Sequence, residues 1–172
     1  MKILYLCQNN KGRSIALAAY TDYFLKKRDS KNITVASAGI AYEFIESLKS
    51  RGFDGPSRTT AHILAQQGLN ISDHKLTHAK EAIKGSSLIL ITDTSTLERT
   101  IQEFPSHQDK CFLAKEFAGF TTQTEIFGPH AESRKDSNDG NWTERVGYEH
   151  MLREIKSISR RIAKRRIAKR LR

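Results

Sequence analysis

Four short apolar or β-branched runs divide the chain at intervals. They cover residues 2–6, 32–39, 86–93 and 110–114. Short runs of this kind, bounded by polar residues or glycine, are typical of strands buried in a parallel sheet. The pattern therefore predicts four strands, the first of which begins almost at the N-terminus.

Stretches with apolar residues at helical spacing follow these runs. We predict helices over residues 13–28, 57–69 and 95–104, and a last amphipathic helix from Trp142 toward the C-terminus. Between them, residues 121–141 are polar and irregular, so we expect a long loop there. Strands that alternate with helices predict an α/β fold with a four-stranded parallel sheet flanked by helices.

The positive charge is concentrated at one end of the chain. Of the 172 residues, which carry a net charge of +10, residues 160–172 hold a dense run of Lys and Arg without an acidic residue. We therefore divide the chain into a domain over residues 1–159 and a basic amphipathic helical extension over residues 160–172. The extension suits contact with anionic lipid or nucleic acid, and it equally suits a solvated, charged helix end.

The cysteines and the hydropathy of the chain indicate the cellular compartment and the absence of cofactors. The two cysteines form no C-x-x-C pair and no cluster with metal-ligand spacing, and no segment reaches the length of a membrane span or a signal peptide. We expect a cytoplasmic protein without structural disulfides, and with no metal or organic cofactor.

The segment CQNNKGRS, residues 7–14, joins the first predicted strand to the first predicted helix. Ligands of parallel α/β sheets bind at the carboxyl ends of the strands, where this segment lies. Successive N–H groups at the start of a helix can form a nest for a phosphate group, and the helix dipole favours the anion. The expected phosphate-binding residues are Gln8, Asn9, Asn10, Lys11, Gly12 and Arg13.

Three side chains of this segment suit cysteine-dependent chemistry. The positive field at the helix start favours the thiolate form of Cys7, which would be the nucleophile. Arg13 offers a planar pair of donors to two phosphate oxygens, and Ser14 can donate a hydrogen bond to the sulfur. A C-x5-R-S pattern also occurs by chance in an ordinary strand-to-helix turn, but its position between a strand and a helix favours a functional loop.

The same segment resembles the N-terminal signature of the low molecular weight protein tyrosine phosphatase family, in which C-x4-C-R-[ST] follows a strand and precedes a helix. Residues 36–39 (ASAG), 55–78 and 88–101 are similar to later family segments in the same order. The resemblance implies a phosphatase that hydrolyses phosphomonoesters, foremost protein phosphotyrosine, through a Cys7-phosphate intermediate. It also implies that Asn10 and His74 support the loop, and that the partner is a phosphorylated protein or a small phosphate ester.

The loop departs from the family pattern at three positions. The first loop glycine of the family is Asn9 here, its second cysteine is Gly12, and the proline that often follows the serine is Ile15. Without the second cysteine, the protective disulfide that the family forms with its nucleophile is not expected.

A fourth departure concerns the general acid, which the family carries in an Asp-Pro motif of the late loop. Here Gly128 precedes the only proline of that region. Four residues of the same segment could replace this acid: His130, Glu132, Asp136 and Asp139. We rank Asp136 and Asp139 first together, because no argument from spacing selects between these two. The alternative hypothesis is a catalytically impaired phosphate-binding or phosphoprotein-binding module, because proton transfer contributes roughly 10²- to 10⁴-fold in rate.

A few remaining residues need an interpretation. Cys111 is expected as a buried strand cysteine. Asp93 ends the third strand, where it either adjoins the site or begins a helix. Tyr42, Phe44 and Phe53 line the substrate cleft if the resemblance holds, although one or two of them equally suit the core. We expect surface positions for the remaining isolated histidines: His62, His78, His107 and His150.

Overall fold

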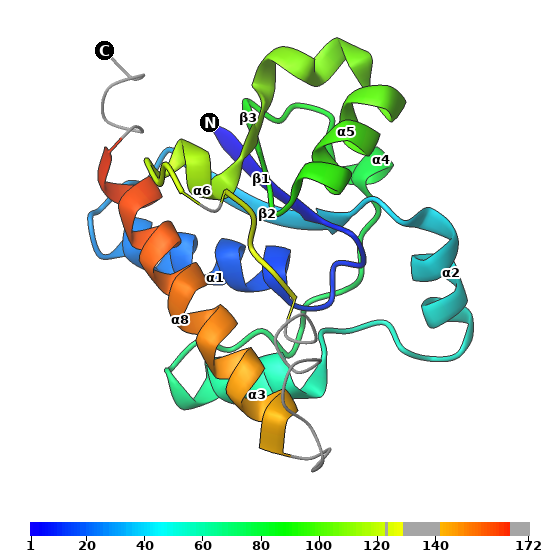
Figure 1. Cartoon of the computed structure of the whole chain (residues 1–172), viewed down its shortest axis with the longest axis vertical. Helices are drawn as coiled ribbons and strands as arrows, with labels where there is room; N and C mark the ends of the chain where they lie inside the picture. The colour runs from blue at the N-terminus through cyan, green and yellow to red at the C-terminus, as the bar shows by residue number, and fades with distance from the viewer. Residues whose placement is uncertain (123, 129–141, 166–172) are drawn as a thin grey trace.

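The computed structural model describes residues 1–122, 124–128 and 142–165. Its centre is a four-stranded parallel sheet in the order β2-β1-β3-β4 (Figure 1). The strands are β1 (Lys2–Cys7), β2 (Thr34–Gly39), β3 (Leu88–Ile91) and β4 (Cys111–Leu113). All four lie inside or close to the runs that the sequence predicted, and the α/β fold class is confirmed.

Helices cover both faces of this sheet (Figure 1). The longer ones are α1 (Arg13–Lys26), α2 (Tyr42–Ser50), α3 (Arg58–Gln66), α5 (Thr94–Glu103) and α8 (Trp142–Arg165). Short turns of helix are α4 (Ala79–Ala82), η1 (Pro105–Lys110) and α6 (Ala114–Phe117). The sequence predicted α1, α3, α5 and α8 but not α2. That helix buries only Ile45 and Leu48, three residues apart, which is a short signal among exposed polar and aromatic residues.

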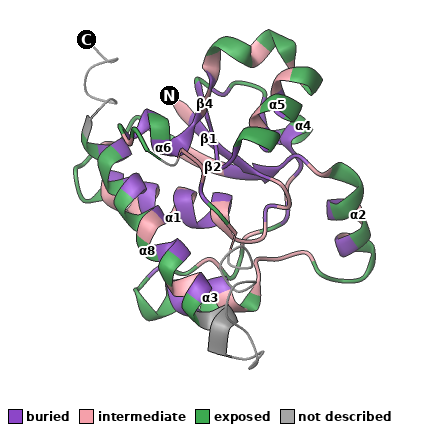
Figure 2. Cartoon of the chain, viewed as in Figure 1, coloured by how far each residue is buried: buried purple, intermediate pink, exposed green. Residues whose placement is uncertain are grey.

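The sheet separates two apolar cores, as the alternation along β1 requires. Ile3 and Tyr5 pack on one face with residues of α1, α3 and α8, and Leu4 and Leu6 pack on the other face with residues of α4 and α5. Figure 2 shows the result, with the strands buried and the outer helix faces exposed. Within the described residues, no helix is both long and apolar enough to cross a membrane.

Helix α8 packs along α1 and closes the larger core. It continues without a break past Ser159, where the sequence analysis placed a domain boundary, as far as Arg165. Ile162 and Ala163, beyond that boundary, are buried in the core. The division into 1–159 and 160–172 stays a prediction, and most of the basic extension lies outside the described residues.

Candidate active site

The carboxyl end of β1 carries the loop that the sequence singled out. Cys7 is the last residue of β1, only 3% exposed, and Arg13 is the first residue of α1. The Cys7 Sγ atom lies 3.0 Å from the Ser14 Oγ atom. This is the geometry in which the Ser14 hydroxyl can donate to a thiolate, so strand, loop and helix bring the two predicted residues together.

Asn10 holds the loop from within. It is fully buried, and its backbone has a φ of 52°, a left-handed conformation that asparagine adopts more readily than most residues. Its side-chain amide donates to Ser14 Oγ at 3.1 Å and to Ser37 Oγ at 3.0 Å. Its side-chain oxygen accepts from the Thr77 N–H at 3.0 Å and contacts His74 Nε2 at 2.9 Å. The family resemblance implied that Asn10 and His74 support the loop, and both lie beside it.

The His74 contact requires a donor, since an amide oxygen only accepts. Burial lowers the pKa of His74, and the nearby Asp54 carboxylate raises it by less. The net effect favours the neutral ring. A neutral ring with its proton on Nε2 donates to Asn10 and leaves no buried charge behind the loop.

The end of β2 fits closely against the same loop. A Cβ atom added to Gly39 would lie 2.8 Å from the Gln8 carbonyl oxygen, 2.9 Å from the Asn10 nitrogen and 2.7 Å from a carbon of Ile45. Real Cβ atoms essentially never approach backbone so closely, so only glycine lets the loop pack here. This fit constrains the loop where it passes the end of β2.

Arg13 is oriented by Asp93. The Arg13 Nη1 atom donates to Asp93 Oδ2 at 2.8 Å and to the Ile126 carbonyl at 2.9 Å. Asp93 also caps α5, because its other carboxylate oxygen accepts from the Thr96 N–H at 2.9 Å. The two alternatives that the sequence left open for Asp93, a place beside the site and a helix start, are therefore both realised.

The surroundings of Asp93 keep its carboxyl group ionised. Burial alone would raise the pKa of Asp93, but hydrogen bonding by Thr96, the Arg13 charge and the Thr92 hydroxyl together lower it below its usual value. The carboxylate thus provides a fixed negative charge that orients Arg13. A group in this state holds no proton to deliver to a leaving group at neutral pH.

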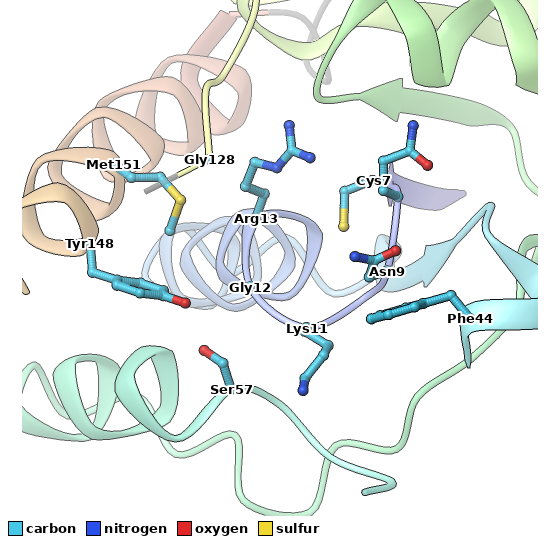
Figure 3. A pocket seen from close by; sticks show the side chains of 11 residues that line it. Cys7, Asn9, Lys11, Gly12, Arg13, Phe44, Ser57, Gly128, Tyr148 and Met151 are labelled. Carbon is cyan, nitrogen blue, oxygen red and sulfur yellow. The ribbon is translucent and has the colours of Figure 1, made fainter. Parts of the chain in front are cut away.

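A cavity of about 320 Å³ opens over the loop (Figure 3). From the loop and the start of α1 it is lined by Cys7, Gln8, Asn9, Lys11, Gly12 and Arg13. The rings of Tyr42, Phe44 and Phe53 are all exposed, and of the three only Phe44 from α2 lines the cavity, as the resemblance implied. Gly128 lies at its edge.

Three lining residues were not among the predicted site residues: Ser57, Tyr148 and Met151. Ser57 caps α3, and its N–H donates to the Lys11 carbonyl at 2.8 Å. Tyr148 and Met151 lie on α8, more than 130 residues from the loop in sequence. Their only signal was an amphipathic pattern that fits a core helix equally well.

The remaining predictions divide. His130, Glu132, Asp136 and Asp139 lie outside the described residues, so their suggested roles as acids stay predictions. Cys111 is buried, as expected, and burial together with Asp109 raises the pKa of its thiol to about 11.

The surface position expected for His78 is wrong. Its ring is buried because Nδ1 accepts from the Lys80 N–H at the start of α4 and the ring packs edge-on against Tyr42.

Comparison with known proteins agrees with this geometry. The sequence profile of the family described as "Low molecular weight phosphotyrosine protein phosphatase" matches residues 2–172. The chain belongs to this family. Family membership makes it a cysteine-dependent phosphatase and favours that function over the impaired binding module considered above. No curated protein sequence matches the chain significantly.

Solved structures with the same fold share little sequence with this phosphatase. A low molecular weight protein tyrosine phosphatase from T. tengcongensis is 22% identical, with a TM-score of 0.72 over 94% of this chain and 97% of the other. Wzb from Vibrio vulnificus, in complex with benzylphosphonate, is 23% identical, with a TM-score of 0.71 over 95% and 97%. The YwlE arginine phosphatase from Geobacillus stearothermophilus is 22% identical, with a TM-score of 0.71 over 99% and 95%.

Proposed function

We propose that this phosphatase hydrolyses aryl phosphate monoesters, foremost phosphotyrosine, with Cys7 as its nucleophile. The observation that carries the proposal is the 3.0 Å contact between Cys7 Sγ and Ser14 Oγ at the base of the cavity. It joins a cysteine at a strand end, a hydroxyl at a helix start and a loop of N–H groups between them. That arrangement suits a thiolate facing a phosphate group.

In the first step the Cys7 thiolate attacks phosphorus, and the bond from phosphorus to the ester oxygen breaks as the phosphorus–sulfur bond forms. Arg13 and the loop N–H groups from Gln8 to Arg13 bind the non-bridging oxygens as charge develops on them. Water then attacks the phosphocysteine, which releases inorganic phosphate and the thiolate. The Ser14 hydroxyl, hydrogen-bonded to the sulfur, stabilises that thiolate as it leaves.

The leaving oxygen needs a proton in the first step. Asp93 is unsuited to provide it, because its lowered pKa and its bond to Arg13 keep it ionised. We assign this role to the pair Asp136 and Asp139, one of which acts as the general acid. Both belong to the segment that follows Gly128 at the cavity edge.

The cavity walls favour an aryl leaving group. Figure 3 shows the rings of Tyr148 and Phe44 on opposite sides of the phosphate loop, and the buried Met151 adds a further apolar wall. Apolar and aromatic walls around a few placed polar groups are what a site for a ring-bearing ligand requires. Wzb, whose fold this chain shares, was solved with benzylphosphonate, which carries a ring similar in size to the phenol ring of phosphotyrosine.

The test is hydrolysis of 4-nitrophenyl phosphate against pH by the wild type, Cys7→Ser, and an Asp136→Ala/Asp139→Ala double variant, with phosphate binding measured by calorimetry. The nitrophenolate leaves with little protonation, so a missing acid does not conceal a working nucleophile. We expect no turnover by Cys7→Ser. For the double variant we expect a loss of roughly 10²- to 10⁴-fold on unactivated phenyl phosphate and a smaller loss on the nitrophenyl ester.

Matched peptides that carry phosphotyrosine, phosphoserine or phosphoarginine then address the substrate. We expect the phosphotyrosine peptide to have the highest kcat/KM. Turnover of the nitrophenyl ester that survived Cys7→Ser would overturn the assigned nucleophile. Equal rates on the three peptides would overturn the aryl preference.

A further inference from the structure

Lys11 is a cation in a firmly held part of the phosphate loop. Its carbonyl accepts from the Ser57 N–H at 2.8 Å, which ties the loop to the start of α3. The neighbouring Asn10 is fixed by its buried amide, so the Lys11 backbone is held from both sides. The position from which this side chain extends is therefore defined, although the side chain itself is only partly buried.

Lys11 and Arg13, the cations among the described residues that line the cavity, are in different electrostatic situations. Arg13 has a carboxylate partner, Asp93, at 2.8 Å. For the Lys11 ammonium, the described part of the chain contains no ion pair and no side-chain hydrogen bond. No described residue that lines the cavity is acidic. The positive charge of Lys11 is thus available to a bound molecule.

The direction of Lys11 separates it from the phosphate nest. Figure 3 shows its ammonium end directed away from the Cys7 sulfur, into the space between Ser57 and Phe44. A phosphate group over Cys7 contacts the loop N–H groups and Arg13. A volume of about 320 Å³ is within the range of small-molecule sites, roughly 300–1,000 Å³, and exceeds what one phosphate group fills. Lys11 therefore faces the remainder of the substrate.

We propose that Lys11 selects phosphate monoesters that carry a second anionic group beside the phosphorylated one. This inference rests on the proposed function and narrows its substrate class. The second group is a carboxylate or phosphate on the same molecule, as in a small phosphorylated acid or a peptide with an acidic residue next to phosphotyrosine. The attraction operates across a partly solvated cavity, so it acts as a preference of moderate size that salt weakens.

The test compares substrates that differ only in this charge. The small pair is 3-carboxyphenyl phosphate and 3-carbamoylphenyl phosphate, and the peptide pair has Glu or Gln next to phosphotyrosine. We expect the wild type to favour the charged member by about two- to tenfold in kcat/KM at low salt. Lys11→Gln retains the backbone N–H but removes the charge, and we expect the ratio to fall to about one.

Lys84→Gln is the matched control, because it makes the same change in net charge elsewhere. Lys84 is exposed and precedes β3, so it lies at the opposite edge of the sheet from Cys7, which ends β1. The control should keep the wild-type ratio. A preference confined to one substrate pair would support the inference and identify the source of the second anion. A ratio near one for both pairs in the wild type, or a ratio that survives Lys11→Gln, would overturn it.

Binding separates this inference from the proposed function. Calorimetry with 3-carboxyphenylphosphonate and 3-carbamoylphenylphosphonate reports the charge preference without turnover. A preference in binding that Lys11→Gln removes would support the inference even if no ester were hydrolysed, in which case the proposed function alone would fail. Equal affinity for the two phosphonates, together with turnover that Cys7→Ser abolishes, would sink the inference and leave the function intact.

Discussion

At the scale of single residues, the phosphate loop depends on the amide of Asn10. Its two ends contact Ser14 of α1, Ser37 of β2, and His74 and Thr77 of the loop before α4, which are three different segments of the chain. Each contact is buried or partly buried, where an unsatisfied partner costs about 1–3 kcal/mol. The loop is thus shaped by protein contacts before any phosphate arrives, which reduces the reorganisation that binding requires.

Asp93→Asn tests how much Arg13 depends on its partner. Asparagine can still cap α5, but it has no charge to offer Arg13. The pKa of Asp93 is lowered in the folded protein, so its carboxylate stabilises the fold above the unfolded value of about 3.9, and this stabilisation is lost as pH falls through the folded value. We expect Asp93→Asn to lower the free energy of unfolding by about 1–3 kcal/mol at pH 7, and the difference to shrink below about pH 4.

Urea denaturation between about pH 3 and pH 8 measures this difference. Asp29→Asn is the control, because Asp29 pairs with Lys31 on the surface and has a positive φ that asparagine tolerates. Surface pairs of this kind contribute little, so we expect a change below about 1 kcal/mol. A deficit in Asp93→Asn that stayed constant down to pH 3 would contradict the argument from the carboxylate charge.

At the scale of elements, the sequence was informative where one segment carried its own signal. The four strands were predictable because each is a compact apolar run, and α1 because it follows the loop with helical spacing. Helix α2 was not, because Ile45 and Leu48 become a buried face only when β2 and the segment around Leu76 are in place.

The candidate site divides in the same way. Cys7, Arg13 and Ser14 were predictable because they lie within one short motif whose chemistry is local. The contribution of Tyr148 and Met151 was not, because it arises only when α8 crosses the mouth of the cavity. The pairing of Arg13 with Asp93 is intermediate: the sequence placed both at the same sheet edge, but only the fold shows the 2.8 Å contact.

Helix α8 should stabilise the domain beyond the boundary that the sequence suggested. Ile162 is 1% exposed in the core that α8 shares with α1, so Ile162→Ala leaves a cavity and should cost about 2–4 kcal/mol. Val146→Ala on the same helix is the control, because Val146 is 57% exposed and should change stability by less than about 0.5 kcal/mol. Urea midpoints of both variants measure this. Equal costs would show that α8 beyond Ser159 is not part of the core.

At the scale of the whole molecule, the two cysteines are placed too far apart to protect each other. Cys7 ends β1, whereas Cys111 begins β4 and is level with Leu4 through the pairing of both strands with β3. Two strand spacings of about 4.8 Å and three residues of about 3.3 Å each separate them. A disulfide needs Cα atoms within about 7 Å, so Cys7 and Cys111 cannot pair in this fold.

This separation predicts how the phosphatase responds to peroxide. Cys7 has no thiol to trap its sulfenic acid, so continued exposure should carry it to the irreversible sulfinic acid. Burial, which raises the pKa of Cys111 to about 11, keeps that thiol protonated and unreactive. We expect peroxide to cause a loss of activity that dithiothreitol does not reverse. The intact mass of the oxidised protein should increase by two oxygen atoms, and it should not show the loss of two hydrogen atoms that a disulfide would cause. Cys111→Ser should lose activity at the wild-type rate, and bound phosphate should slow the loss because it covers the sulfur. Full recovery with dithiothreitol, or protection that disappears with Cys111→Ser, would mean that the chain opens enough to bring the two strands' cysteines together.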